Sequence, residues 1–287
     1  MWLLLAVLAQ FELQGRLEPP VRASVSLHAA SSPFSVSALA GPDGTFRFRG
    51  LDPGSYTIAV FVPGSGEMRQ TFDIGPAGAD KRGRVRRTFT LSAELMNREA
   101  AHQVSARALA IPERAKREYE EAQRCLAKRD IAGAIERLDR AVEIAPSYAA
   151  AWNNLGTIAY QTQRFPDAER NFRRALEADP DSYEPLVNLG GVLINNSNLE
   201  EAWKYNVYAV LRRPGDALAQ AQLGMTYLGL NKLDLAEKHL LEAVRLDPGH
   251  FSHPQLQLAQ LYLRKGDRAN AAKQVEAFRV LHPDWHR

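Results

Sequence analysis

The sequence predicts a multidomain protein in which an N-terminal antiparallel β-sandwich is followed by an all-α superhelical solenoid. Two observations predict this division. Between residues 11 and 92, apolar and polar residues alternate with a period of two, and clusters of turn-forming residues separate the alternating runs. From about residue 115 onward, proline and alanine recur every 34 residues within a pattern of paired amphipathic helices.

Residues 1–9, MWLLLAVLA, form an uncharged apolar run. The run is far shorter than the roughly 20 residues of a membrane-spanning helix, so no transmembrane span is predicted. It is a candidate signal segment that ends in the small-residue site Val7-Leu8-Ala9, which would leave Gln10 as the mature N-terminus. The n-region lacks Lys and Arg, so an apolar first strand or a misassigned start codon stays an alternative. We expect a periplasmic or secreted protein, or otherwise a cytoplasmic one.

Residues 10–92 contain several short alternating runs. In GTFRFRG, Phe46 and Phe48 alternate with Arg47 and Arg49, and YTIAVFV alternates in the same way. The turn clusters GPDG, LDPGS and VPGSG lie between such runs. Short strands joined by turns of this kind are typical of an antiparallel β-sandwich.

One part of this region carries a more specific pattern. The run DGTFRFRGLDPGSYTIAV, residues 43–60, resembles carboxypeptidase regulatory-like domains, which are prealbumin-like sandwiches. The matching positions are Asp43, Gly44, Phe46, Leu51, Pro53, Gly54 and Tyr56. The resemblance implies a non-catalytic attached domain, and we expect it to serve in support or adhesion.

The segment KRGRVRR, residues 81–87, has five basic residues in seven. One interpretation is a phosphate-binding patch. The other is a solvated edge strand, with Arg84 and Arg86 directed to solvent, since charged edge strands prevent unwanted pairing. No aromatic residue is interleaved for base stacking, and residues 111–287 balance 24 basic against 24 acidic residues. We therefore predict no nucleic-acid partner.

Residues 93–114 are predicted to be a linker, and residues 115–285 five helical repeats. The predicted repeats are 115–148, 149–182, 183–216, 217–250 and 252–285. Prolines fall at 146, 180, 214, 248 and 283, alanines at 134, 168, 202, 236 and 271, and small residues at 122, 156, 190, 224 and 259. Small residues let the two helices of a repeat approach closely, and proline ends the second helix.

This 34-residue pattern is identified as that of tetratricopeptide repeats of a bacterial type. Repeat two carries the family's residues best, as Trp152, Leu155, Gly156, Ala168, Phe172, Ala175 and Pro180. Repeat three departs from the pattern with Asn206 at a normally apolar position. Repeat five departs from it with a one-residue insertion near His250–His253 and with Phe278 in place of alanine. The resemblance implies a protein–protein interaction scaffold in which the first helix of each repeat lines a concave groove.

In this register, Asn154, Asn188, Gln222 and Gln257 occupy one position of successive first helices. An amide side chain can donate to and accept from a peptide backbone at once. Adjacent helices lie about 8–10 Å apart and an extended peptide rises about 3.3 Å per residue, so one amide would meet the peptide at about every third residue. The predicted peptide-binding residues are Asn153, Asn154, Thr157, Tyr160, Asn188, Gln222, Met225 and Gln257. In the alternative interpretation, these amides bond neighbouring helices or water.

Catalytic patterns are weak in this sequence. His239 and Glu242 have the His-x-x-Glu spacing of two zinc ligands, but both fall on the second helix of repeat four and are expected to face solvent. The single cysteine, Cys125, excludes an intramolecular disulfide and a Cys-rich zinc site. No phosphate-binding loop or nucleophile elbow occurs. We predict no catalytic site, no metal and no cofactor.

The predicted function is a non-catalytic scaffold whose groove binds an extended peptide segment of a partner protein. The alternative is a cell-envelope or polyanion-associated assembly factor that binds through the basic β domain. The array stops at Pro283 without an extra capping helix. We therefore expect weak self-association at the C-terminal end, where Val275, Phe278 and Leu281 are predicted to be thinly covered.

Overall fold

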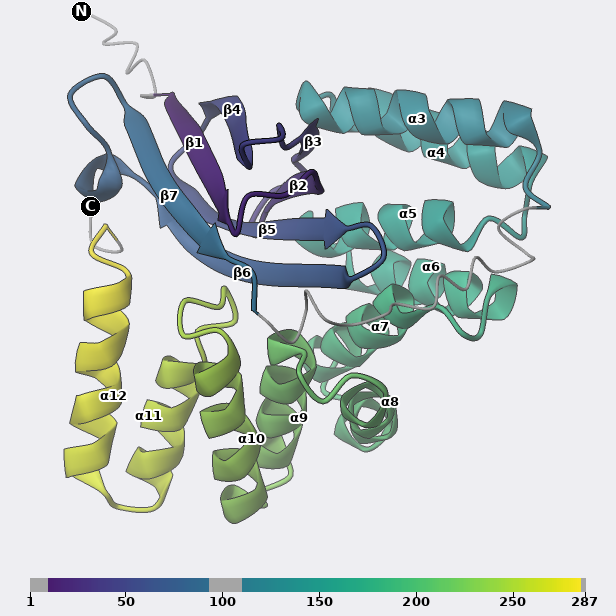
Figure 1. The fold of residues 1–287 in the computed structure, drawn as a ribbon. Helices are drawn as coiled ribbons and strands as arrows, with labels where there is room; N and C mark the ends of the chain where they lie inside the picture. The colour runs from purple at the N-terminus through teal and green to yellow at the C-terminus, as the bar shows by residue number, and fades with distance from the viewer. Residues whose placement is uncertain (1–9, 93–109, 285–287) are drawn as a thin grey trace, which may run out of the picture. The chain divides into compact units, whose positions relative to one another are not determined.

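The computed structural model describes residues 10–92 and 110–284, which divide into two compact units (Figure 1). One unit consists mainly of strands in residues 10–92, and the other mainly of helices in residues 110–281. The predicted two-part architecture is therefore confirmed. The candidate signal segment and residues 93–109 of the predicted linker lie outside the described residues. In the described ranges, no helix is both long and apolar enough to span a membrane.

The β unit is a sandwich of two sheets, one with strand order β4-β1-β7 and the other with order β3-β2-β5-β6. The strands are β1 (Phe11–Glu18), β2 (Ser24–Ala29), β3 (Ser35–Leu39), β4 (Thr45–Leu51), β5 (Gly54–Val62), β6 (Gly66–Ile74) and β7 (Arg84–Thr90), with the 3₁₀ turn η1 (Pro76–Gly78) between the last two. β1 and β7 pair in parallel, whereas the other pairs are antiparallel. The sandwich is thus mixed, which the antiparallel prediction did not include, because alternation carries no information on strand direction.

Aromatic rings fill the core between the sheets. Phe89 on β7 packs against Phe46 on β4, with ring centroids 5.9 Å apart, and against Phe72 on β6 at 5.4 Å. The Phe46 ring also covers Gly15, its partner on β1, where any added Cβ would overlap the ring. The glycine therefore makes the room in which the ring is buried.

Some residues of the carboxypeptidase regulatory-like pattern hold the turns at the two ends of β4. The Asp43 carboxylate accepts hydrogen bonds from the Thr45 backbone N–H at 3.1 Å and the Thr45 hydroxyl at 2.8 Å. Gly44 has a φ of +75°, which favours glycine. The Tyr56 hydroxyl donates to the Asp52 carbonyl at 2.9 Å. These short-range bonds fix the two ends of β4.

β7 lies at the edge of its sheet, as the edge-strand interpretation predicts. Arg86 is exposed, but Arg84 is half-buried, because its guanidinium bonds the Asp80 carboxylate at 2.9 Å. Asp80 also accepts from the backbone N–H groups of Arg84 at 3.0 Å and Arg82 at 2.9 Å. These bonds, the one from the Arg84 backbone first, lower the pKa of Asp80 to about 2. Arg84 and Arg86 both lie on the face away from the core, as predicted, because Val85 between them is buried, and the ion pair with Asp80 leaves the Arg84 side chain 32% exposed.

The helical unit contains ten helices within residues 110–284, arranged as five consecutive pairs. The helices are α3 (Glu113–Ala127), α4 (Ile131–Ile144), α5 (Ala149–Gln161), α6 (Phe165–Ala178), α7 (Tyr183–Asn195), α8 (Leu199–Arg212), α9 (Ala217–Gly229), α10 (Leu233–Leu246), α11 (Pro254–Arg264) and α12 (Arg268–Leu281). α3, α5, α7, α9 and α11 are the first helices of the pairs. Figure 1 shows the pairs stacking in chain order.

Small residues lie where the two helices of a pair meet. A Cβ added at Gly156 on α5 would lie 2.5 Å from the Phe172 ring on α6. A Cβ added at Gly190 on α7 would overlap the side-chain oxygen of Asn206 on α8. The recurring alanines at 134, 168, 202, 236 and 271 are likewise buried. The predicted role of small residues in close helix approach is thus confirmed.

A second repeated contact lies at three of the boundaries between repeats. The second helices end two residues before each recurring proline, and the proline carbonyl is capped by a side chain from the following first helix in three repeats. The pairs are Trp152 Nε1 with the carbonyl of Pro146 at 2.9 Å, Gln220 Nε2 with that of Pro214 at 2.8 Å, and Gln255 Nε2 with that of Pro248 at 2.6 Å. Trp and Gln share only an N–H donor, so residue type alone does not reveal this position.

The turn inside each repeat uses a left-handed residue. Arg129, Gln163, Ser197 and Asn231 have φ values between +57° and +60°, and Gly266 has a φ of +77°. The five positions are spaced like the prolines, by 34, 34, 34 and 35 residues. A non-glycine residue in this conformation is strained by roughly 1–2 kcal/mol. Four of the five turns therefore carry strain that glycine would remove.

We expect Gln163→Gly to raise the free energy of unfolding by about 0.5–1 kcal/mol, because the relief of strain exceeds the entropy cost of glycine. Gly266→Ala is expected to lower it by about 1 kcal/mol, since a Cβ there meets no atom within 4 Å and only the backbone conformation is penalised. Urea denaturation of both variants measures these shifts. Shifts of the same sign would contradict the assignment of these turns.

The fifth repeat absorbs its insertion in the loop at residues 247–253. His253 takes a left-handed φ of +50° directly before α11. The Phe278 side chain is only 3% exposed and its ring meets the His253 ring edge-on at 5.1 Å. The prediction that Phe278 is thinly covered is therefore wrong, because the ring packs beside this inserted loop. Val275 and Leu281 are exposed, and self-association at this end stays a prediction.

Candidate peptide-binding groove

The predicted groove residues lie on α5, α7, α9 and α11, the first helices of repeats two to five. α7 contacts both α5 and α9, and α9 contacts α11, so the four helices form one layer. Tyr160 is 37% exposed, Gln222 is buried, and the remaining six are half-buried, namely Asn153, Asn154, Thr157, Asn188, Met225 and Gln257. All eight side chains are uncharged.

Two of the predicted asparagines bond each other across neighbouring repeats. The Asn188 side-chain NH₂ on α7 donates to the Asn153 side-chain carbonyl on α5 at 3.0 Å. The Thr157 hydroxyl donates to the Asn153 backbone carbonyl at 3.0 Å and so stays on its own helix. Among the described residues, neither Asn153 Nδ2 nor Asn188 Oδ1 has a hydrogen-bond partner. The pair thus keeps one donor and one acceptor available.

Two further bonds repeat this step of 35 residues. Asn154 Nδ2 donates to the Tyr119 hydroxyl on α3 at 3.2 Å, and Asn195 Nδ2 donates to the Tyr160 hydroxyl on α5 at 2.9 Å. Burial raises the pKa of Tyr119, so the phenol stays neutral at physiological pH. Sequence reasoning missed Tyr119 and Asn195. Comparing residues 35 positions apart would have found both Tyr–Asn pairs.

The amides of repeats four and five are arranged differently. The Gln222 amide nitrogen packs against α7, where a Cβ on Gly191 would lie 2.6 Å from it. Its carbonyl oxygen is buried and has no hydrogen-bond partner in the part of the chain that the structure describes. The Gln257 side chain has none there either. Met225 packs against the apolar cluster around Leu258. Among the described residues, side-chain amide bonds between neighbouring first helices are therefore found only on α3, α5 and α7.

Both interpretations of the asparagines have a structural basis. Asn154 and Asn188 bond neighbouring helices, as the alternative interpretation expects. Each bond uses only one end of the amide, and an asparagine can make up to four hydrogen bonds. The interhelical bond also fixes the side-chain rotamers, so the unused ends are held in one orientation. A peptide backbone needs one donor and one acceptor at such a position.

The candidate zinc ligands are occupied by other contacts. His239 Nδ1 shares a hydrogen bond of 2.8 Å with Gln220 Oε1, and the ring stacks on Tyr227 with centroids 5.6 Å apart. Glu242 forms a salt bridge with Arg245 at 2.6 Å. Within residues 10–92 and 110–284, no three His, Cys, Asp or Glu side chains are grouped to hold a metal ion.

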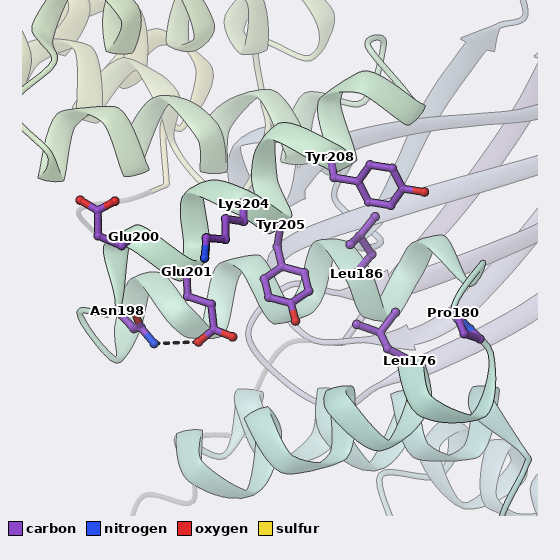
Figure 2. Close-up of a pocket in the computed structure, with 9 residues that line it drawn as sticks. All are labelled: Leu176, Pro180, Leu186, Asn198, Glu200, Glu201, Lys204, Tyr205 and Tyr208. Atoms are coloured by element: carbon purple, nitrogen blue, oxygen red, sulfur yellow. Dashed lines mark hydrogen bonds between the residues drawn. The ribbon is translucent and has the colours of Figure 1, made fainter.

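A cleft that the sequence did not reveal lies between α6, α7 and α8 (Figure 2). Its volume is about 870 Å³. Figure 2 shows Tyr205 and Tyr208 from α8 beside Leu176 from α6 and Leu186 from α7. None of the eight predicted groove residues lines it. The cleft and the predicted groove are thus separate surfaces of the helical unit.

Comparison with known proteins finds family matches within the helical unit. One family model described as tetratricopeptide repeat matches residues 119–183 and 156–217, and a second matches residues 217–250. The chain is 34% identical over 92 residues to the inactive TPR repeat-containing thioredoxin TTL3 of Arabidopsis thaliana, covering 32% of this chain and 13% of that protein. It is 28% identical over 107 residues to the BBSome complex member BBS4 homolog of Drosophila melanogaster, and the match covers 37% of this chain and 21% of that protein. The chain thus spans about a fifth or less of the length of these relatives.

Solved structures share the same fold at low sequence identity. MamA from Desulfovibrio magneticus RS-1, from residue 41 to its end, aligns with a TM-score of 0.54 and 22% identity over 62% of this chain and all of that chain. YrrB aligns with a TM-score of 0.50 and 24% identity, and the alignment covers 63% of this chain and 94% of YrrB. PilW aligns with a TM-score of 0.54 and 20% identity, and the alignment covers 60% of this chain and 79% of the PilW chain. The family models thus show tetratricopeptide repeats within residues 119–250, and the solved structures show that the helical unit has the same solenoid fold.

Proposed function

We propose that this protein is a non-catalytic interaction scaffold whose solenoid groove holds an extended peptide segment of a partner protein. Tetratricopeptide repeats are generally protein–protein interaction scaffolds. The observation that carries the finer proposal is the Asn153–Asn188 pair, which joins two neighbouring first helices and keeps a donor and an acceptor unused. A peptide lying across the helices would receive one bond from each side chain.

The chemistry of the groove fits recognition of a backbone better than recognition of a charge. The eight residues are uncharged, so no ion pair selects a terminal carboxylate or a basic side chain. Asn153 Nδ2 would donate to a peptide carbonyl, and Asn188 Oδ1 would accept from a peptide N–H. Because the amides are already oriented by their mutual bond, little side-chain entropy is lost when the peptide binds.

The relatives support the proposal at the level of the fold. YrrB is described as a TPR protein with an unusual peptide-binding site, and PilW as a type IV pilus biogenesis factor. Peptide binding by YrrB supports a comparable role for this solenoid. The β-sandwich is proposed to be a carboxypeptidase regulatory-like domain that supports or attaches the solenoid, in keeping with the turns at Asp43–Gly44 and Tyr56. On this proposal, substitutions on the outer surface of the sandwich leave the affinity for a groove peptide unchanged.

The test begins with a peptide selected on an array by the full chain, whose affinity is then measured by fluorescence anisotropy. Asn153→Ala and Asn188→Ala are each expected to weaken binding by about 3- to 10-fold, since each lost bond contributes roughly 0.5–1.5 kcal/mol. Stability should fall by no more than about 1 kcal/mol, because the lost interhelical bond is partly offset by the better helix propensity of alanine.

The matched control is Asn196→Ala, an exposed asparagine at the end of α7. It should leave the affinity unchanged. The proposal fails if the two groove variants bind the peptide as tightly as this control while their melting temperatures fall sharply. That result would assign the asparagines to helix packing alone.

A further inference from the structure

The outer face of the three-stranded sheet carries an ordered set of polar side chains. Gln14 on β1 lies opposite Arg47 on β4 and Arg86 on β7, and Arg16 lies opposite Thr45 and Thr88. Residues opposite each other on paired strands share a face, and residues two apart on one strand do too. Leu13, Gly15 and Leu17 of β1 face the core, so these six point outward. They line a shallow depression of about 600 Å³.

The carboxylates on this face do not balance the arginines. Glu12, next to the depression on β1, is shared by Arg47 at 3.4 Å and Arg49 at 3.2 Å. One carboxylate thus pairs with two guanidinium groups. The hydrogen bond from Gln14 lowers the pKa of Glu12 most, and the two arginines lower it further. The β4 side of the face therefore keeps a net positive charge.

The β7 side has the same imbalance. Asp80 is already held by the Arg84 side chain and two backbone N–H groups, and Arg86 approaches it only to 3.7 Å. Arg16, between the two sides, forms no salt bridge with any other described residue. Arg16, Arg47 and Arg86 thus surround the depression with guanidinium groups that are only partly neutralised.

We propose that this face binds a linear anionic polysaccharide, independently of the peptide groove. Arg16, Arg47 and Arg86 contact its carboxylate or sulfate groups through charge-assisted hydrogen bonds. The Gln14 amide and the hydroxyls of Thr45 and Thr88 donate to and accept from sugar hydroxyls. The polymer lies across the three strands, because the side chains of one row follow each other in that direction.

The side chains that are absent from this face select against other polyanions. No large apolar or aromatic side chain is exposed on β1, β4 or β7 in the described residues. Nucleic-acid bases therefore find no ring on which to stack, and a lipid surface receives no apolar side chain to insert.

The test measures binding of the full chain to heparin, a sulfated and carboxylated polysaccharide, as a function of salt. Arg16→Gln/Arg86→Gln is expected to weaken binding about 5- to 20-fold, since each exposed ion pair contributes up to about 1 kcal/mol. The slope of log K against log salt should become shallower by about 2. The control Arg22→Gln/Arg69→Gln removes the same charge elsewhere in the β unit and should stay within about twofold of the parent.

Three competitors separate the partner classes at the same salt concentration, namely poly-glutamate, single-stranded DNA and phosphatidylserine vesicles. Heparin should bind most tightly, and the double variant should keep the affinity for a groove peptide. If the glutamine double variant melts at a lower temperature than the parent, Arg16→Lys/Arg86→Lys is measured as well. This lysine variant keeps the charge and should retain more heparin affinity than the glutamine variant. Equal losses in the face and control variants, or tighter binding to any competitor, overturn the proposal.

Discussion

Gly190→Leu is expected to lower the free energy of unfolding by about 3 kcal/mol, the larger end of the range for overpacking a core. The glycine lies on the side of α7 that packs against α8, and even a Cβ would overlap the Asn206 side chain. Asn206 cannot move aside freely, because it is fully buried and its NH₂ donates to the Thr226 hydroxyl on α9 at 3.0 Å. The added side chain would therefore force α7 and α8, the two helices of repeat three, apart.

A double-mutant cycle tests this cause. Gly190→Ala alone should destabilise the protein, but in an Asn206→Ala background it should cost less, because the overlapping atom is gone. Contacting residues typically show coupling energies of about 0.5–3 kcal/mol, and we expect a value in this range from urea denaturation. Additive effects would contradict the proposed contact between Gly190 and Asn206.

Phe89→Ala is expected to cost about 3–5 kcal/mol in the β unit, the usual range for deleting a buried phenylalanine. Phe89 is 1% exposed and stands between Phe46 on its own sheet and Phe72 on the other. Its removal leaves a cavity at the junction of the two sheets. Urea denaturation followed by the circular dichroism of the β-sheet measures the loss.

Phe61→Ala on β5 is the control for this prediction, since the Phe61 ring is 40% exposed. It should lower the free energy of unfolding by less than about 1 kcal/mol, as surface substitutions usually do. A loss as large as that of Phe89→Ala would mean that the core is not organised around the three rings.

The sequence predicted the architecture because its signals are periodic. Alternation marked the strands, and the 34-residue spacing marked both the helix pairs and the small residues at Gly156 and Gly190 where they meet. The parallel β1–β7 pair was missed because alternation looks the same in either strand direction. The left-handed turns were missed because Arg129, Gln163, Ser197 and Asn231 share a backbone conformation and no side-chain property.

The candidate groove was predicted less completely than the fold. The register assigned Asn153, Asn154 and Asn188 to the first helices, where they are found. It did not reveal that Asn188 bonds Asn153 or that Tyr119 accepts from Asn154, because such bonds depend on how far apart and how rotated neighbouring helices are. Gln222 shares the register position of Asn188 and yet is buried, since Gly191 leaves space for its longer side chain.

The most direct test of the groove uses a photo-crosslinking phenylalanine derivative in place of one tyrosine at a time. Tyr160 lies on α5 among the predicted groove residues, and Tyr208 lines the separate cleft on α8, with 37% and 48% of their surfaces exposed. Each variant of the full chain is irradiated in its native host and its crosslinked partner is identified. Peptide binding in the groove predicts a partner crosslinked to an extended segment at position 160 and none at position 208. Crosslinks at position 208 alone would contradict it.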